Sequence, residues 1–394
     1  MTPRSSLVPA ALTAVLVTAS LAGGRAQAVL APLPTTATAP RDNPTTAEKI
    51  ALGRLLFWDP ILSGPRDIAC ATCHHPDFGY AEPLDLSIGT GGAGIGGARA
   101  FMPGAPVRPV KRNSQTVLNA AFNGIDATGT HAPSSAPMFW DLRVRSLETQ
   151  ALEPIKALDE MRGETYPEDR AVAMVVDRLA SIAEYRERFS RAFGGRNPVS
   201  ETNLARALAA FQRSLVTPNA PFDRYMRGDA TAMSPQQVNG MNRFQQAGCI
   251  NCHSGPMFSD FLPHVLAVPD NMKLSESDTG VDGTFAFRTA SLRNLSSTAP
   301  YMHNGAFTNL NQVVNFYNRI ARGGRGGGGR GGGGRGGAIN ANVARDQVDP
   351  LARQLNLRGG RQNDLVAFLR ALDDDAFDRS IPERVPSGLK VGGN

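Results

Sequence analysis

Four cysteines mark the clearest chemistry in this chain. All of them stand in two copies of a C-x-x-C-H motif, C-A-T-C-H and C-I-N-C-H, at Cys70, Cys73, Cys249 and Cys252. In such a motif the two thiols add to the vinyl groups of a haem, and the histidine that follows supplies a nitrogen to its iron. His74 and His253 are therefore the expected iron ligands. The sequence predicts two covalently bound haem c groups.

Two other uses of these cysteines fit the sequence less well. A zinc site leaves the repeated terminal histidine unexplained. A redox dithiol of the thioredoxin type needs a βαβ setting, which the chain lacks.

The N-terminus reads as a secretory signal. A short basic start, M-T-P-R-S-S, precedes a long apolar run and the small-x-small site A-Q-A at 26–28. This order predicts a signal peptide at 1–28, cleaved after Ala28. The alternative is an uncleaved anchor at 5–24, which Pro9 and two glycines weaken. Haem attachment to thiols suits an oxidising compartment, so we expect a periplasmic protein without a membrane span after cleavage.

Net charge says little about partners. The formal charge is +6, and removal of 1–28 takes away Arg4 and Arg25 and leaves +4. The propionates of two haems would offset much of that. The remaining length is enough for two domains with cores of their own.

The elements around the two motifs look helical. Apolar residues recur at helical spacing in 45–57, 170–182, 203–216 and 234–246. Thr45 and Glu48 suggest a capping box for the first segment, and Ser234 with Pro235 suggests the start of the last. No run alternates long enough to build a sheet. We predict an all-α fold of two cytochrome c-like domains, 29–215 and 216–394, each with one haem.

Three stretches read as loops: 87–112, 123–137 and the Gly/Arg segment 322–337. RGG repeats can bind RNA, but a secreted haem protein meets little nucleic acid. We therefore interpret 322–337 as a disordered surface loop and expect no nucleic-acid partner.

Ordered blocks along the chain carry a family resemblance. They run from G-R-L-L-F-W-D-P (53–60) through L-S-I-G, N-S-Q-T-V-L-N, F-W-D-L-R, S-L-E-T-Q-A-L-E-P-I, L-R-N and A-P-Y-M-H-N-G to L-V-A-F-L-R-A-L (365–372). Together with the two haem motifs they resemble the bacterial di-haem cytochrome c peroxidases and MauG. The resemblance covers nearly the whole chain after the signal.

Glu160 is the catalytic acid–base residue that the resemblance implies. Peroxide cleavage needs a group that takes a proton from the near oxygen and returns it to the far one. A glutamate beside another acid is, taken alone, most simply a surface charge. The family's catalytic glutamate lies twenty residues after a tryptophan, as Glu160 does after Trp140. Gln150 likewise matches the family's amide in the peroxide pocket.

Trp140 matches the family residue that lies between the two haems and passes electrons or holes across. Taken alone, a tryptophan is most simply a core residue, as we expect of Trp58. One departure is visible, because the family's usual W-D-G-R is W-D-L-R here, with Leu142 in place of glycine. This places the local turn in question.

The face of the first haem away from His74 should be open. Many family members carry a haem-capping histidine directly after S-I-G, and here the residue is Thr90. Threonine is a poor haem ligand. His75 adjoins the proximal ligand, and His131 is most simply exposed. We predict a five-coordinate haem, with Met102 or His131 as the alternative ligand.

Tyr317 is the expected second ligand of the haem at His253. Family peroxidases often place methionine fourteen residues after the histidine of P-Y-x-H, which is His303 here, and MauG places tyrosine there. A phenolate ligand favours ferric and higher states. Ala247, by contrast, stands where MauG has a surface tryptophan that passes holes to its protein substrate.

The family also binds calcium between its domains, with an asparagine side chain and two backbone carbonyls. The matching positions are Asn113, Thr298 and Pro300. We expect one calcium ion there. His264 and His303 are expected to be structural and to approach propionates.

The leading hypothesis is thus an enzyme that reduces hydrogen peroxide. Its electrons would come from a small periplasmic donor, a cytochrome c or cupredoxin. The alternatives are a MauG-like enzyme that oxidises side chains of a partner protein, and a di-haem electron carrier that is no enzyme.

Overall fold

The computed structural model describes residues 28–394 except 106, 324–338, 358–359 and 361. The predicted signal peptide at 1–28 therefore lies almost wholly outside the described residues, as does most of the Gly/Arg segment at 322–337.

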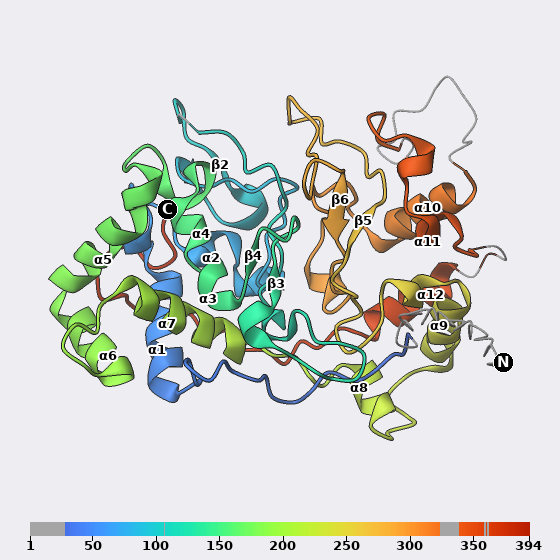
Figure 1. Ribbon diagram of the computed structural model, residues 1–394, viewed down its shortest axis with the longest axis horizontal. Coiled ribbons are helices and arrows are strands. Elements are labelled where there is room, and N and C mark those ends of the chain that lie inside the picture. The colour runs from blue at the N-terminus through green and yellow to red at the C-terminus, as the bar shows by residue number, and fades with distance from the viewer. Residues whose placement is uncertain (1–27, 106, 324–338, 358–359, 361) are drawn as a thin grey trace, which may run out of the picture.

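Helices make up most of the regular structure, and the strands are two or three residues long (Figure 1). The helices are α1 (Ala47–Trp58), α2 (Cys70–Cys73), α3 (Leu147–Gln150), α4 (Glu153–Lys156), α5 (Ala171–Ser181), α6 (Ala183–Phe193), α7 (Glu201–Ser214), α8 (Pro221–Met226), α9 (Pro235–Gln246), α10 (Leu310–Ala321), α11 (Pro350–Arg353) and α12 (Gln362–Arg370). The strands are β1 (Gly92–Ala93), β2 (Ala100–Phe101), β3 (Pro137–Met138), β4 (Val144–Arg145), β5 (Pro263–Val265) and β6 (Ala286–Arg288). They pair as three antiparallel two-stranded sheets, β1-β2, β3-β4 and β5-β6. The all-α prediction is confirmed for the described residues.

The four predicted helices are present. α5 and α9 lie within a residue or two of their predicted bounds, and α9 begins with the capping box of Ser234 and Gln237. The predicted cap of α1 was wrong by one residue, because the side chain of Thr46, not Thr45, accepts the hydrogen bond from the N–H of Lys49. Helix ends are decided by such local competition between neighbouring hydroxyls.

Each half of the molecule is built on a crossing of two helices. In the first half α1 packs on α7, and a Cβ at Gly53 would lie 2.0 Å from the carbonyl oxygen of Ala207. In the second half α9 packs on α12, and a Cβ at Gly240 would lie 1.9 Å from the carbonyl oxygen of Asp364. In both crossings glycine lets two helix backbones touch. A C-x-x-C-H motif follows α1 in one half and α9 in the other.

Both ends of the described chain cross to the opposite half. Leu30 forms a β-bridge with Gly255, and the N–H of Leu33 donates to the Asp223 carboxylate over 2.8 Å. In Figure 1 this blue segment runs below the molecule towards α8. The first residues after the predicted cleavage site therefore belong to the second half.

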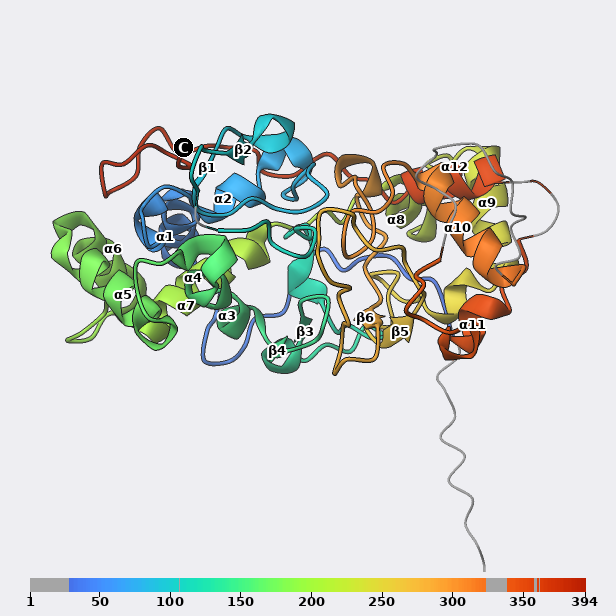
Figure 2. The ribbon, with the colours of Figure 1, turned by 90° about the horizontal axis from the view of Figure 1, so that it is seen from above.

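The C-terminal tail returns to the first half. Phe377 and Val385 lie in the core of the first half. The N–H of Gly392 donates to the Trp58 carbonyl over 2.8 Å, and Thr72 donates to the Gly392 carbonyl over 2.8 Å. Figure 2 shows the red tail passing along the upper edge of the molecule to this end. The predicted domain boundary at 215 stays a prediction, and the crossing tails had no sequence signal.

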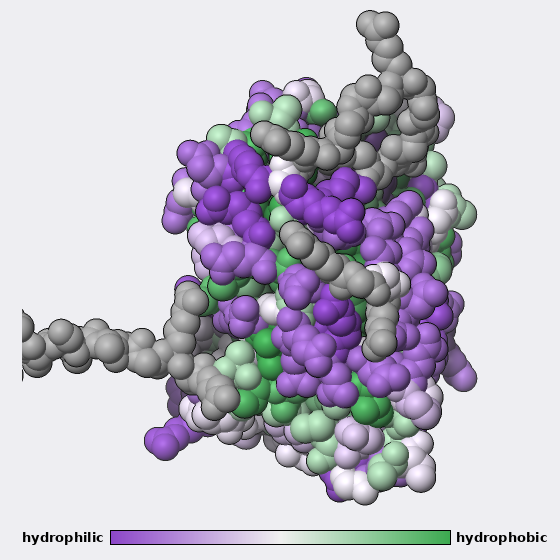
Figure 3. Space-filling model, turned by 90° about the vertical axis from the view of Figure 1, so that its right-hand side faces the viewer, coloured by the Kyte–Doolittle hydropathy of each residue, from purple (hydrophilic) through white to green (hydrophobic). Residues whose placement is uncertain are grey.

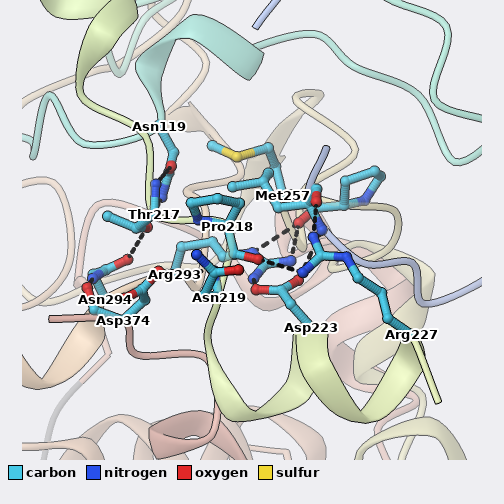
Figure 4. Close-up of polar contacts among 12 residues, drawn as sticks. Asn119, Thr217, Pro218, Asn219, Asp223, Arg227, Met257, Arg293, Asn294 and Asp374 are labelled. Atoms are coloured by element: carbon cyan, nitrogen blue, oxygen red, sulfur yellow. Dashed lines mark hydrogen bonds and ion pairs between the residues drawn. The ribbon is translucent and has the colours of Figure 1, made fainter. Parts of the chain in front are cut away.

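A buried polar cluster ties the halves together at the linker (Figure 4). Thr217 accepts a hydrogen bond from Asn119 and donates one to Asn294, which in turn donates to the Asp374 carbonyl over 2.8 Å. Beside them Arg293 and Asp223 form a buried ion pair of 2.6 Å. Asn119 belongs to the first half, and Asn294 and Asp374 belong to the second. Because the buried polar groups are satisfied only when these residues meet, the cluster holds the two halves in one relative position.

The end of the molecule formed by the second half carries mainly hydrophilic side chains, with hydrophobic ones gathered toward its lower part in this view (Figure 3). Among the described residues no helix has the length and apolar character to cross a bilayer.

Candidate di-haem site

Both cysteine motifs line one continuous cavity of about 790 Å³. Its walls include all four cysteines, His74 and His253, together with Trp140, Gln150, Glu160 and Tyr317. The structure thus brings together every residue for which the sequence predicts haem attachment, electron transfer or proton transfer. The cavity runs between the two halves.

The two motif histidines are held in the same way. The Nδ1 of His74 lies 3.1 Å from the Tyr80 carbonyl, and the Nδ1 of His253 lies 2.9 Å from the Phe258 carbonyl. Tyr80 and Phe258 both have left-handed backbones, with φ of 55° and 52°. A hydrogen bond to Nδ1 orients an imidazole and leaves Nε2 for a metal. Burial also lowers the pKa of both histidines and keeps them neutral, as ligation requires.

The cysteine surroundings favour thioethers over a thiolate metal site. Burial raises the pKa of Cys70 and of Cys249 to about 12, which disfavours free thiolates. Cys252 does lie near Asp260 and His264 in a potential metal-binding group. However, both ring nitrogens of His264 are hydrogen-bonded to carboxylates, over 3.0 Å to Asp260 and 2.6 Å to Asp349. His264 is therefore committed to these partners rather than to a metal.

Arg288 tests whether the cavity suits a haem. Its side chain is buried, lines the cavity and forms no ion pair within the described part of the chain. It donates to the Phe139 carbonyl over 2.9 Å and to Gln115 over 3.2 Å, and burial alone lowers its pKa to about 10. A buried guanidinium without an acid calls for an anion. A haem propionate supplies one, so the residues present fit the group.

Glu160 lies in a single π-helical turn, Leu158–Arg162, after α4. The N–H of Arg162 donates to the Ala157 carbonyl, five residues back, over 3.0 Å. Such turns recur at functional sites. Glu160 forms no ion pair with any described residue, and burial raises the pKa of its carboxyl. The expectation of a surface charge from its acidic surroundings does not hold.

The first site offers no strong second ligand from the predicted loops. Thr90 is buried beside Gly163 and is absent from the cavity wall. Met102 is 41% exposed, and neither it nor His131 lines the cavity. The expectation that His131 is exposed was wrong, because its Nε2 lies 3.0 Å from the Asn123 carbonyl and its ring is half-buried.

Gln150 and Trp140 reach the cavity from the loop and helices before the π-helical turn. Gln150 ends α3, whose Ser146 cap bonds the N–H of Thr149. The indole N–H of Trp140 donates to the Asn113 carbonyl over 3.0 Å. Its own carbonyl accepts from the N–H of Arg288, in the second half, over 2.8 Å. Trp140 is therefore fixed between the halves.

Leu142, which replaces the glycine of the family's usual W-D-G-R, has a backbone conformation that suits glycine. Its φ is 61°, in the left-handed region. A non-glycine residue there costs about 1–2 kcal/mol. Trp58, in contrast, is 2% exposed and lies in the core, as expected.

Tyr317, on α10, lines the cavity with the second motif. Burial raises the pKa of its phenol well above the ordinary value. A phenolate at this position therefore needs a nearby cation, which ferric iron would supply. His303 is buried, stacks on Phe287 at 3.7 Å between ring centroids and has a pKa lowered to about 3 by burial.

The three expected calcium positions also border the cavity. Asn113 donates its backbone N–H to the His303 carbonyl over 2.7 Å, which brings it to the segment that holds Thr298 and Pro300. The calcium ligands stay a prediction.

Sequence reasoning missed two cavity residues. Arg288 has no motif of its own, and its only signal is a basic residue in the otherwise apolar run A-F-R. Arg112 bridges the halves through buried ion pairs with Asp141 and Asp278, each 2.5 Å. Only the fold shows that these charges meet.

Comparisons with known proteins agree with this site. Residues 47–231 match the family model for di-haem cytochrome c peroxidase. The chain is 34% identical over 403 residues to cytochrome-c peroxidase IdrP1 of a Pseudomonas species (strain SCT), covering 93% of this chain and 91% of that protein. It is 32% identical over 349 residues to methylamine utilization protein MauG of Methylorubrum extorquens, covering 87% and 83%.

A solved structure shares the fold over most of its length. A MauG-like protein associated with microbial copper homeostasis superposes with a TM-score of 0.66 at 25% identity, covering 89% of this chain and 95% of that one. With one cavity joining two haem-attachment motifs, the chain belongs to the di-haem cytochrome c peroxidase family of oxidoreductases.

Proposed function

We propose that this protein is a periplasmic enzyme that reduces hydrogen peroxide at the haem site of Cys70, Cys73 and His74. The observation that supports this most is Glu160. It is a partly buried carboxyl without an ion-pair partner among the described residues, burial raises its pKa, and it lines the same cavity as this motif. Perturbed carboxyls of this kind are typical of acid–base catalysts.

In this proposal the protein's own groups move one proton. The ionised Glu160 takes the proton from the near oxygen of peroxide and returns it to the far oxygen, which leaves as water. When bound, the haem supplies the iron at which peroxide reacts and the electrons for its cleavage. The Gln150 amide orients the peroxide by hydrogen bonding. Burial lowers the pKa of His74 and keeps its ring neutral, while the contact of its Nδ1 with the Tyr80 carbonyl orients the ring.

The second site stores and relays charge. Trp140 offers an aromatic ring in the wall that both sites share, and its hydrogen bond to the Asn113 carbonyl fixes that ring. His253 and Tyr317 are the residues that would hold the second haem. Electrons then come from an external donor, a cytochrome c or cupredoxin.

A MauG-like role is the second candidate, because Tyr317 lies where a phenolate would favour oxidised states. Its donor would be a side chain of a partner protein. The surface route of MauG has no counterpart here, since Ala247 is 2% exposed and the chain's two tryptophans are the core residue Trp58 and the cavity residue Trp140. A protein substrate would therefore need another exit. We also propose calcium at Asn113, Thr298 and Pro300.

The test is steady-state peroxide turnover with reduced cytochrome c, for the wild type and two variants. Glu160→Gln should lower kcat about 10²–10⁴-fold, the usual worth of general acid–base catalysis, with both haems still bound. Glu164→Gln is the matched control, since Glu164 is exposed and lies one turn further on. Unchanged kinetics in Glu160→Gln would remove this residue from the mechanism.

Two outcomes separate the alternatives. Failure to oxidise cytochrome c, together with rapid formation of a long-lived oxidised state, favours the MauG-like role. Two low-spin ferric haems that do not respond to peroxide, observed by EPR and absorption, identify an electron carrier.

A further inference from the structure

The π-helical turn that carries Glu160 is held from outside by two other backbone segments. The N–H of Thr90 donates to the Glu160 carbonyl over 2.9 Å. The N–H of Gly64 donates to the Met161 carbonyl over 2.7 Å. Consecutive carbonyls of the turn thus each have a specific donor from elsewhere in the fold.

Close approach of these segments requires glycine. A Cβ at Gly89 would lie 2.0 Å from the Asp159 carbonyl oxygen and 2.4 Å from that of Glu160. A Cβ at Gly64 would lie 2.0 Å from the Arg162 carbonyl oxygen. Neither glycine has a left-handed φ. The requirement is therefore space, not backbone conformation.

Each glycine segment is in turn fixed by one arginine. Arg99, 3% exposed, donates to the carbonyls of Ile88 (2.7 Å), Gly89 (2.8 Å) and Gly94 (3.0 Å). Arg178 donates to the carbonyls of Ile61 (3.2 Å), Ser63 (2.6 Å) and Gly64 (2.8 Å). Neither arginine has an ion-paired carboxylate in the described part of the chain. Arg99 also donates to the Asn394 carbonyl over 3.2 Å, and Arg178 also donates to the Tyr166 hydroxyl. Two of the carbonyls that each arginine holds belong to its glycine segment.

We propose that Arg99 and Arg178 are positioning residues for Glu160, acting through the glycine segments 88–90 and 63–64. This inference rests on the proposed role of Glu160 in peroxide cleavage. The arginines fix the segments, the segments fix the carbonyls of the π-helical turn, and the turn sets where the Glu160 carboxyl enters the cavity. Segment 88–90 thereby serves the catalytic carboxyl rather than supplying a haem ligand.

Arginine is the residue that suits this task. Its planar guanidinium directs several donors at fixed angles, so one side chain can hold carbonyls of successive residues, whereas the lysine ammonium is a single point on a flexible chain. A displacement of about 1 Å at a catalytic group can cost about 10²-fold in rate. Arg99→Lys should thus fail to replace arginine.

The experiment measures Gly89→Ala and Arg99→Lys in the haem-loaded full chain. Both should lower kcat by about 10- to 100-fold with little change in KM. Hydrogen exchange of residues 157–163 should become faster. Gly53→Ala is the matched steric control. Its Cβ would lie 2.0 Å from the Ala207 carbonyl oxygen, in a helix crossing that does not include Glu160. Arg227→Lys is the matched arginine control, since Arg227 donates to the backbone carbonyls of Pro218 and Leu33 in the other half.

A double-mutant cycle separates this inference from the proposed function. Gly89→Ala and Arg99→Lys should cost almost nothing further in a Glu160→Gln background, because the group that they position is already disabled. If Glu160→Gln has no effect, the proposed function fails. If Glu160→Gln is slow but Gly89→Ala and Arg99→Lys keep wild-type kcat, or lower it by the same factor in the Glu160→Gln background, the positioning inference is overturned.

Should Gly89→Ala not fold, Arg99→Lys with the exchange measurement decides alone. Faster exchange of 157–163 with unchanged kcat would also contradict the proposal.

Discussion

The two haem-motif regions are alike in how the motif and its histidine are held, and they differ in the other side chains that line the cavity. In both, a helix crossing at a glycine precedes C-x-x-C-H, and the motif histidine bonds a carbonyl from a residue with left-handed φ. The cavity lining differs, because the first half adds Glu160 and Gln150 to it and the second half adds Tyr317. In the proposed function, one scaffold therefore serves reaction at the first site and storage at the second, and the difference comes from the side chains that line the cavity beside each motif.

The largest effect is expected when the predicted second ligand of the second haem is removed, because the two sites should then become alike. Tyr317→Phe removes the hydroxyl that would ligate the second iron, and so should leave a vacant position there. We expect a second equivalent of cyanide to bind, and a second high-spin ferric signal in EPR. Tyr225→Phe, a partly buried residue of α8, is the control. Unchanged binding stoichiometry in Tyr317→Phe would mean that both sites were already open or that another group caps the second.

Cutting the connection between the sites should have the next largest effect. Trp140→Phe keeps an aromatic ring but loses the indole and its hydrogen bond to the Asn113 carbonyl. We expect electron transfer between the haems to slow by about tenfold or more, which is ~1.4 kcal/mol in the barrier. Stopped-flow absorption after peroxide addition measures it. Trp58→Phe, in the core, should lower stability instead, and equal rates in both variants would remove Trp140 from the route.

The regions should also differ in their response to pH. Burial raises the pKa of Glu160 above its ordinary 4.5. Its ionised form is the base, so kcat/KM should be full above that raised pKa and fall as pH drops through it. At the second site burial opposes protonation of His264, but hydrogen bonds to Asp260, Cys252 and Asp349 outweigh it and raise its pKa to about 11. Titration of His264 should therefore not change kcat/KM in the pH range in which Glu160 becomes protonated.

One buried carboxyl could obscure that measurement. Burial raises the pKa of Glu82, near Cys73, to about 7. The pH profile is therefore measured in the wild type and in Glu82→Gln. An acid limb that disappears in Glu82→Gln would assign it to Glu82 and not to Glu160.

The smallest expected effect concerns the turn that follows Trp140. Leu142→Gly relieves a left-handed φ worth about 1–2 kcal/mol but loses about 0.5–1 kcal/mol of chain entropy. We expect a net stabilisation of at most about 1.5 kcal/mol, seen as a small rise in Tm. Leu262→Gly, at an exposed position without a left-handed φ, should lower Tm. A lower Tm in Leu142→Gly would show that its side-chain packing outweighs the strain.

Part of this protein follows from local sequence. The C-x-x-C-H motifs contain their own chemistry within five residues. The helices α5, α7 and α9 follow from apolar periodicity, and the start of α9 follows also from its capping residue Ser234. Such features depend on neighbours along the chain, so a sequence determines them directly. Glu160, Gln150, Trp140 and Tyr317 were found only through spacing shared with a family, because their neighbours in sequence are ordinary.

Tertiary structure alone decided the rest. Arg288 and Arg112 meet their partners from the other half, the terminal segments exchange halves, and Arg99 reaches the Glu160 turn through Gly89. These contacts join residues far apart in the chain, and no periodicity or motif specifies which distant backbone a side chain will touch. Sequence therefore determined which groups can hold haem, whereas tertiary packing within each half determined which carboxyl and which phenol line the cavity beside each motif.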